Sequence, residues 1–191
     1  MRIIAGVGKG RNLFSPIGAT RPTSDRAREA LFSTLESEFG SMSDLAFLDL
    51  YCGSGAVSTE ALSRGAAIIY AVDNDDKAIK VTRDNLDLLQ NISGIGTYSA
   101  ITSSVGKFLE KGADLQFDIV FVDPPYDLPN NEIEKTMDAL VRNNFLKPSS
   151  VIAIERDAKS SPIKWPAGLQ EVKTRKYGAA VIIYAEPIAA A

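Results

Sequence analysis

A chain of 191 residues, 45% of them hydrophobic and 24% charged, is long enough to bury one full core, and a single domain over residues 1–191 is expected. It contains no histidine and one cysteine, Cys52, which excludes histidine-based catalysis, internal disulfides and cysteine-rich metal sites, so no metal is expected. No apolar run reaches the ~18 residues of a membrane helix and the N-terminus does not resemble a signal peptide, which predicts a cytoplasmic protein.

The net charge of -3 is unevenly distributed along the chain. Residues 1–36 carry six basic and three acidic side chains, a net of +3, so the remainder must sum to -6. A basic segment on an acidic body indicates a local surface for an anionic ligand. The same charge pattern also fits an ordinary solvated face.

The N-terminal segment is predicted to precede the main fold, with residues 1–22 as a hairpin and connector and residues 23–191 as a helix followed by an α/β core. Short apolar pieces around glycines predict a small irregular hairpin before the connector. Thr23 or Ser24 is expected to cap the helix, whose first turn carries Asp25, because negative charge is favourable at a helix N-terminus.

The helix that follows is expected to bury one stripe of its surface. Its apolar residues recur every four positions, at Ala27, Leu31, Leu35 and Phe39. Arg26 and Arg28 lie outside this stripe, so both are predicted to face solvent.

From residue 46 onward, apolar strands alternate with helices. Strands are expected at 46–50, 68–72, 98–101, 117–122 and 151–154, helices at 57–63, 75–89, 105–111 and about 133–141, and a hairpin at 172–177 and 180–184 turning near Gly178. Fully apolar strands separated by helices predict a mostly parallel, doubly wound α/β sheet of seven strands. Ligands of such sheets bind at the carboxyl ends of the strands, where the chemistry is therefore expected.

The first of these strands runs into a short glycine loop, Asp49-Leu50-Tyr51-Cys52-Gly53-Ser54-Gly55. Gly53 and Gly55 let the backbone approach a ligand at a helix N-terminus, although an ordinary turn would use the same residues. Asp49 adds information, because a carboxylate there suits a cationic group such as an α-amino group and would repel a pyrophosphate.

The second strand ends at Asp73, 18 residues after Gly55. An acid in this place usually binds ribose hydroxyls in nucleotide-binding sheets. Capping of the next helix is the alternative role. Taken with the glycine loop and Asp49, Asp73 indicates a cofactor that carries a nucleoside.

The strand at 117–122 is followed by Asp123-Pro124-Pro125-Tyr126, the most specific motif of the chain. Two consecutive prolines fix the backbone and remove two N–H donors, so carbonyl oxygens are presented. Asp123 adds a carboxylate acceptor, and Tyr126 adds a face on which a base can stack. The motif is suited to accept hydrogen bonds from a planar amino group, although prolines after a strand can simply end it.

These segments resemble the motifs of class I S-adenosylmethionine-dependent methyltransferases that modify exocyclic amines of nucleobases. The early Gly-x-x-x-Gly-Arg-x-Leu pattern (Gly6 to Leu13) and the segment from Arg21 to Phe32 narrow the resemblance to the RsmD family, the bacterial 16S rRNA guanine-N2 methyltransferases. The similarity runs from Arg2 to the region of Tyr184. It implies a Rossmann-like fold, S-adenosylmethionine as cofactor, and 16S rRNA or a partly assembled small ribosomal subunit as partner of a monomeric enzyme.

The resemblance also implies roles for individual residues. The target guanine would be held by Asp123, Pro124, Pro125 and Tyr126. The cofactor would be bound by Thr23, Asp49, Tyr51, Gly53, Ser54, Gly55, Asp73 and Ser104, the last standing where many relatives place an Asp or Asn against the adenine. Because the N-terminal segment is basic, rRNA phosphates are expected to meet Lys9, Arg11, Arg21, Arg26 and Arg28.

Other functions fit less of the sequence. A DNA adenine-N6 or cytosine-N4 methyltransferase shares the chemistry, but the short chain leaves no room for a target-recognition domain. An NAD-binding oxidoreductase is disfavoured by the missing third glycine and by Asp49, and a non-catalytic RNA-binding module would have no use for Asp73 and Asp123 together. Cys52 is more readily explained as a small buried side chain than as a nucleophile.

Overall fold

The computed structural model describes residues 1–15 and 25–188. Its helices are α1 (Asp25–Phe39), α2 (Ala56–Ser63), α3 (Asp76–Asp87), α4 (Val105–Glu110) and α5 (Asn130–Arg142). Its strands are β1 (Ala46–Leu50), β2 (Ile68–Asp73), β3 (Thr97–Thr102), β4 (Phe117–Val122), β5 (Leu146–Asp157), β6 (Leu169–Tyr177) and β7 (Ala180–Pro187). Among these helices, none has the length and apolarity needed to cross a bilayer.

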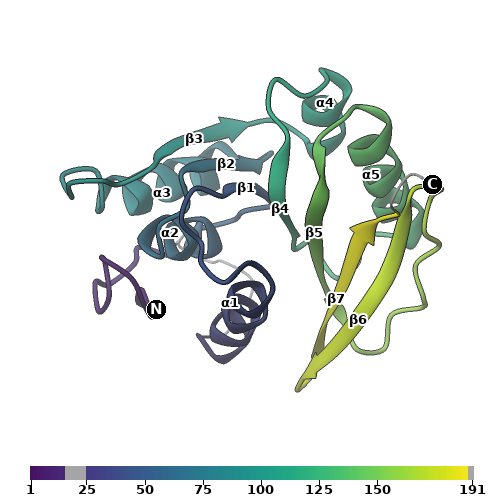
Figure 1. Cartoon of the computed structure of the whole chain (residues 1–191), viewed down its shortest axis with the longest axis horizontal. Coiled ribbons are helices and arrows are strands. Elements are labelled where there is room, and N and C mark those ends of the chain that lie inside the picture. The colour runs from purple at the N-terminus through teal and green to yellow at the C-terminus, as the bar shows by residue number, and fades with distance from the viewer. Residues whose placement is uncertain (16–24, 189–191) are drawn as a thin grey trace.

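All seven strands form one sheet in the order β3-β2-β1-β4-β5-β7-β6 (Figure 1). The pairs from β3 to β5 are parallel, whereas β7 runs antiparallel to both β5 and β6. The chain moves outward from β1 to β3 and then returns to place β4 on the other side of β1. The carboxyl ends of β1 and β4 are therefore neighbours at the switch point, where open α/β sheets bind their ligands.

Helices cover both faces of the sheet, as the apolar strands predict. One hydrophobic cluster joins α1, α2 and α3 to the sheet, with the rings of Phe32 and Phe47 stacked 6.2 Å apart. The other cluster joins α4 and α5 to the opposite face, where Phe117 and Phe145 stack at 6.5 Å. Figure 1 shows α4 and α5 together on the side away from α1. The doubly wound architecture is thus confirmed.

The strand expected at 151–154 is longer in the structure, extending over Leu146–Asp157. The apolar pattern covers only the middle of this strand, because its first residues are irregularly paired and its last residues are charged. The register with β4 shifts between Phe117 and Ile119, and the Ser150 hydroxyl donates to the Phe117 carbonyl at 2.6 Å. The polar residues at the other end, Glu155 and Arg156, remain paired with β7 and are buried.

The N-terminal segment forms the small hairpin that its glycines predict. Its strands meet in one antiparallel bridge, Arg2 with Asn12, and the Ile3 amide donates to the Arg11 carbonyl at 2.9 Å. Gly6 has φ of 77°, and a Cβ at this position would lie 1.8 Å from the Ser63 carbonyl oxygen. The hairpin therefore packs so closely against α2 that a side chain at Gly6 would clash with its backbone.

Candidate active site

The register of four parallel strands aligns several polar residues at one edge of the sheet. Val72, Leu50, Val122 and Ile154 are paired side by side on β2, β1, β4 and β5. Asp73 and Glu155 are the next residues on β2 and β5, while Tyr51 and Asp123 directly follow β1 and β4 at the same edge. Together with Asp49, we call the acids Asp49, Asp73, Asp123 and Glu155 the carboxylate edge.

The glycine loop between β1 and α2 is fixed by hydrogen bonds from its own backbone and from α3. Gly53 and Gly55 have φ of 54° and 68°, the left-handed region that glycine adopts readily. The Gly53 amide donates to Asp73 Oδ2 at 2.9 Å, and the Gly53 carbonyl accepts from the Thr82 hydroxyl at 2.9 Å. The Ser54 carbonyl accepts from Asn85 Nδ2 at 2.8 Å. The loop is therefore preorganised rather than loose.

Asp49 lies beneath this loop and is buried. Its Oδ2 accepts from the backbone amide of Ser58 at 3.1 Å and from the Ser58 hydroxyl. Burial, together with the nearby charges of Asp123 and Asp73, raises the pKa of Asp49 to about 7, although the Ser58 hydrogen bonds oppose this. A cationic ligand above the loop would favour the ionised form.

Asp73 ends β2, and Ser104 follows the neighbouring strand β3 by two residues; each accepts hydrogen bonds from backbone amides. The Asp73 carboxylate accepts from Gly53 and, through Oδ1, from the amide of Asp75 at 3.0 Å, while Asp75 itself caps α3. Ser104 caps α4, its hydroxyl accepting from the Lys107 amide at 3.4 Å. Ser104 and Tyr51 also line one end of a cavity of about 570 Å³ between α4 and α5, a volume suited to a nucleoside.

The Asp123-Pro124-Pro125-Tyr126 motif leaves the sheet directly beside the glycine loop. The Asp123 amide donates to the Leu50 carbonyl at 3.2 Å, which extends the pairing of β4 with β1 by one residue. Pro124 is buried and Pro125 is exposed. Tyr126 is 45% exposed, which is unusual for so large a side chain and leaves a ring face accessible.

Two charged residues of β5 were not foreseen from the sequence. Glu155 is buried, and its carboxylate accepts a hydrogen bond from the Tyr126 hydroxyl. Burial and the charge of Asp123 raise the pKa of Glu155 to about 7. Arg156 points to the other face, where its guanidinium donates to Asn130 Oδ1 at 2.9 Å and to the Leu128 carbonyl, thereby fixing the end of the motif loop. An acid directly after an apolar strand is the signal that would have found Glu155.

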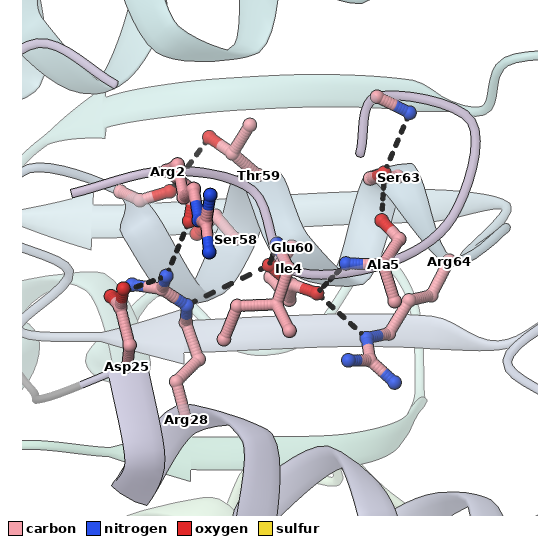
Figure 2. Close-up of polar contacts among 12 residues, drawn as sticks. Arg2, Ile4, Ala5, Asp25, Arg28, Ser58, Thr59, Glu60, Ser63 and Arg64 are labelled. Carbon is pink, nitrogen blue, oxygen red and sulfur yellow. Dashed lines mark hydrogen bonds and ion pairs between the residues drawn. The ribbon is translucent and has the colours of Figure 1, made fainter. Parts of the chain in front are cut away.

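The prediction that Arg28 faces solvent and binds RNA is wrong. Its side chain is fully buried, with Nε 3.6 Å from Glu60 Oε2 and Nη2 donating to the Arg2 carbonyl at 2.6 Å (Figure 2). Glu60 is also buried and accepts from the amides of Ile4 and Ala5 at 2.8 and 2.9 Å. We call Arg28, Glu60 and Arg64, which donates to Glu60 Oε1 at 2.8 Å, the Glu60 anchor.

Arg28 is buried because the buried face of α1 is wider than the stripe of every fourth residue that the sequence predicts. It follows Ala27 directly, and the N-terminal hairpin covers this side of the helix. Desolvation lowers the pKa of Arg28, while the charges of Glu60 and Asp25 oppose that effect. The residue therefore ties the hairpin to α1 and α2 rather than meeting a ligand.

The other basic residues of the N-terminal segment lie in different places. Lys9 and Arg11 are exposed, and Arg11 bonds to the Leu88 carbonyl just beyond α3, near the amino edge of the sheet. Arg26 is exposed at the start of α1, where it lines a cavity of about 270 Å³ with Lys176, Tyr177 and Gly178. This cavity lies at the carboxyl edge. Arg21 and Thr23 lie outside the described residues.

Cys52 is buried, and burial raises its pKa well above the ordinary value. Its sulfur lies 3.7 Å from the Thr82 hydroxyl. A thiol with a raised pKa carries little thiolate, so this environment disfavours a nucleophilic role.

The fold and the glycine loop define a class I methyltransferase. The rRNA methyltransferase AviRa from Streptomyces viridochromogenes has the same fold, with a TM-score of 0.70 at 16% identity over 90% of this chain and 88% of that one. The family described as conserved hypothetical protein 95 matches residues 1–186, and the chain belongs to this family, the RsmD family.

Relatives at higher identity cover nearly the whole chain. The ribosomal RNA small subunit methyltransferase D of Haemophilus influenzae is 34% identical over 182 residues, 93% of this chain and 89% of that protein. The protein of the same name from Escherichia coli (strain K12) is 33% identical over 178 residues, 90% and 84% of the two chains. The putative methyltransferase YhhF from Escherichia coli has a TM-score of 0.82 at 30% identity, covering 98% of this chain and 97% of that one.

The residues present fit S-adenosylmethionine, the cofactor of this class of methyltransferase. Among the described residues, Asp49, Asp73 and Glu155 accept hydrogen bonds from neutral donors. Burial and the charge of Asp123 raise the pKa values of both Asp49 and Glu155. A cofactor that carries a sulfonium and an ammonium group would supply positive charge where burial has removed water. The chain's fold and family are those of S-adenosylmethionine-dependent methyltransferases.

Proposed function

We propose that this chain transfers the methyl group of S-adenosylmethionine to the exocyclic N2 amine of a guanine in 16S rRNA, either free or in a partly assembled small ribosomal subunit. The observation that carries the proposal is the position of Asp123-Pro124-Pro125-Tyr126 beside the glycine loop at the switch point of the sheet. An acceptor for an amino group and a cradle for a nucleoside cofactor are thereby within one site. The rRNA relatives support the substrate class.

In this proposal the glycine loop and the acids below it bind the cofactor. Gly53, Ser54 and Gly55 surround its methionine part, while Asp49 supplies negative charge from beneath the loop. Asp73 accepts from the ribose hydroxyls, because each carboxylate oxygen retains a second lone pair after bonding to a backbone amide. Tyr51 and Ser104 line the cavity that we propose holds the adenine. Thr23, which lies outside the described residues, remains a predicted contact of the methionine part. When bound, S-adenosylmethionine supplies an electrophilic methyl group.

Asp123 and Pro124 activate and orient the target amine. The guanine N2 lone pair is delocalised into the ring, so the free amine is a poor nucleophile. Hydrogen bonds from its two N–H groups to the Asp123 carboxylate and the Pro124 carbonyl favour a pyramidal nitrogen and restore electron density there. The rigid proline pair fixes these acceptors, so that orientation contributes most of the rate enhancement. Tyr126 offers its exposed ring for stacking with the extruded base.

The rRNA backbone is proposed to meet exposed basic groups. Arg26 and Lys176 line one cavity at the same edge of the sheet as Asp123, which suits a phosphate near the target nucleotide. Lys9, Arg11 and Arg21 remain proposed phosphate contacts farther along the N-terminal segment.

A methyl-transfer assay on whole RNA tests the proposed function. Tritiated S-adenosylmethionine is incubated with the purified protein and with RNA or small subunits from cells that lack it, and the labelled nucleosides are separated. We expect label in N2-methylguanosine of 16S rRNA. Label in N6-methyladenosine, or transfer to DNA alone, would contradict the guanine assignment, and tighter binding of NAD than of S-adenosylmethionine would contradict the enzyme class.

A further inference from the structure

The carboxylate edge places a second acid beside Asp123, one strand farther from the glycine loop. Val122 of β4 pairs with Ile154 of β5, so Asp123 and Glu155 follow at the same level on adjacent parallel strands. Neighbouring strands lie about 4.8 Å apart, and the charge of Asp123 acts on Glu155. The two carboxylates therefore border one space, and its outer side is bounded by the exposed ring of Tyr126.

Glu155 has an unmet capacity to accept a hydrogen bond. The residue is 4% exposed, and its Oε2 has no hydrogen-bond partner within the described part of the chain. The described contact of its carboxylate is with the Tyr126 hydroxyl, which belongs to the motif that meets the base. A buried carboxylate oxygen without a donor is costly, and such a cost is commonly retained where a ligand supplies the missing donor.

The hydrogen-bond pattern of the nucleobases determines which ligand could supply it. Adenine, cytosine and guanine each carry an exocyclic amine, but the ring nitrogen on its Watson–Crick side differs. In adenine and cytosine this nitrogen is an acceptor, which a carboxylate would repel. In guanine the N2 amine lies beside N1–H, so the edge presents donors at both positions.

We propose that Glu155 is a specificity-determining residue that accepts the N1–H of the target guanine, while Asp123 accepts from the neighbouring N2 amine. This inference rests on the proposed function, because it assigns a selecting residue to the same site. On entry, the base displaces the Tyr126 hydroxyl from Glu155, and the Tyr126 ring stacks on the base. Two adjacent acceptors thus select the one amine-bearing base with two adjacent donors.

A change of one atom in the side chain, combined with a base analogue that lacks N1–H and O6, tests this pairing. Small subunits are reconstituted on ligated 16S rRNA with guanine or 2-aminopurine at the target nucleotide, since 2-aminopurine keeps the C2 amine but has an acceptor at N1. The wild-type protein and the Glu155→Gln variant are compared by kcat/KM. Wild type should prefer guanine, and Glu155→Gln should lose about 10- to 100-fold on guanine while gaining on 2-aminopurine, because the carboxamide can donate to N1.

The controls distinguish a role of Glu155 in base selection from a role in folding and from general support of the reaction. Glu38→Gln makes the same substitution on an exposed residue of α1 and should leave both rates unchanged. An unchanged unfolding midpoint and unchanged S-adenosylmethionine binding would show that Glu155→Gln is folded. An equal loss on both bases would assign Glu155 to general support of the reaction and overturn the proposal, as would full retention of the guanine preference. Absence of wild-type transfer to guanine would instead refute the proposed function itself.

Discussion

The Glu60 anchor and the carboxylate edge both bury charged side chains, but they do so in opposite ways. In the anchor, the fully buried Glu60 carboxylate meets Arg28 and Arg64 and two backbone amides. At the carboxylate edge, the acids lie near one another, and burial and mutual repulsion raise the pKa values of Asp49 and Glu155 to about 7.

The difference separates structure from function. Opposite charges that pair with one another link segments distant in sequence, even though Nε and Nη1 of Arg28 have no hydrogen-bond partner among the described residues. Like charges gathered at the ligand-binding edge of a sheet raise the free energy of the empty site, and a cationic or donor-rich ligand lowers it. Each of the following changes alters one side of this contrast.

The largest effect is expected from removing the centre of the anchor. Glu60→Gln removes the buried counterion of Arg28 and leaves its guanidinium with only the half-exposed Asp25, which should lower the free energy of unfolding by about 3–5 kcal/mol. Chemical denaturation measures this. Glu36→Gln is the matched control, because Glu36 is 40% exposed in its bond to Arg64 and should cost less than about 1 kcal/mol. Equal effects of the two substitutions would refute the anchor.

Asp49→Asn should raise the free energy of unfolding, in contrast to Glu60→Gln, and the size of this effect should depend on pH. The folded protein raises the pKa of Asp49 from 3.8 to about 7, so between these values the native state binds more protons than the unfolded state. The contribution of Asp49 to stability is therefore greatest below about pH 4 and falls as the pH rises to about 7. Asp49→Asn should stabilise the protein at pH 8 by up to about 4 kcal/mol, since each pKa unit is worth ~1.36 kcal/mol, while weakening cofactor binding.

Denaturation of wild type and Asp49→Asn between pH 4 and 8 checks the sign. Near pH 4 both proteins should have similar stability, and the residual pH dependence of the variant should come largely from Glu155. A variant that is less stable than wild type at pH 8 would show that the Asp49 charge stabilises the fold.

Asp123→Ala should lower methyl transfer by about 100-fold or more, the scale of losing an acceptor that acts in the transition state. Cofactor affinity should change little, because Asp123 faces the amine. Single-turnover transfer and calorimetry give the two quantities. Asp127→Ala in the same exposed loop is the control and should retain activity; a near-normal rate for Asp123→Ala would exclude its catalytic role.

Asp73→Ala and Tyr126→Ala should separate the cofactor from the base. Asp73→Ala should weaken S-adenosylmethionine binding by about 1–3 kcal/mol through unpaired hydroxyls. Tyr126→Ala should spare cofactor binding and weaken RNA binding by a similar amount through lost stacking. Calorimetry with each ligand measures both, and the reverse pattern would mean that the two subsites are exchanged.

The smallest effects are expected from surface cations. Replacing Arg26 and Lys176 with Gln should reduce the slope of log RNA affinity against log salt by about 0.7–0.9 per lost contact. Lys9 and Arg11 form the comparison pair, and their nearness to the amino edge predicts a weaker effect. Equal slopes for wild type and both double variants would place the RNA elsewhere.

The parallel part of the fold was predictable because β1, β2 and β4 are short and largely apolar. Most element boundaries fall within a few residues of the expected ones. The glycine loop and the Asp123 motif were also predictable, since residues at strand ends reach one edge by topology alone. Glu155 lies beside Asp123 because β4 and β5 are neighbours in the sheet. A local sequence pattern does not specify which strands are neighbours, so this placement could not be predicted.

Burial of charge could not be predicted from helical periodicity. Arg28 lies one residue beyond the apolar stripe of α1, and its burial depends on a hairpin and a glutamate far from it in sequence. The contributions of Asn85 and Thr82 to the glycine loop are similar cases, because each acts across about thirty residues through one polar atom.

The position of β7 between β5 and β6 has a consequence for synthesis of the protein. This strand follows both of its neighbours in the chain, yet Ile182 and Tyr184 on it complete the hydrophobic cluster that also contains Ile3. Domains generally fold as units, and here the unit lacks the strand that joins β5 to β6 until β7 has been synthesised. A nascent chain therefore exposes the β5 edge from the synthesis of β5 to that of β7, and chaperones that shield unpaired strands would bind it during that interval.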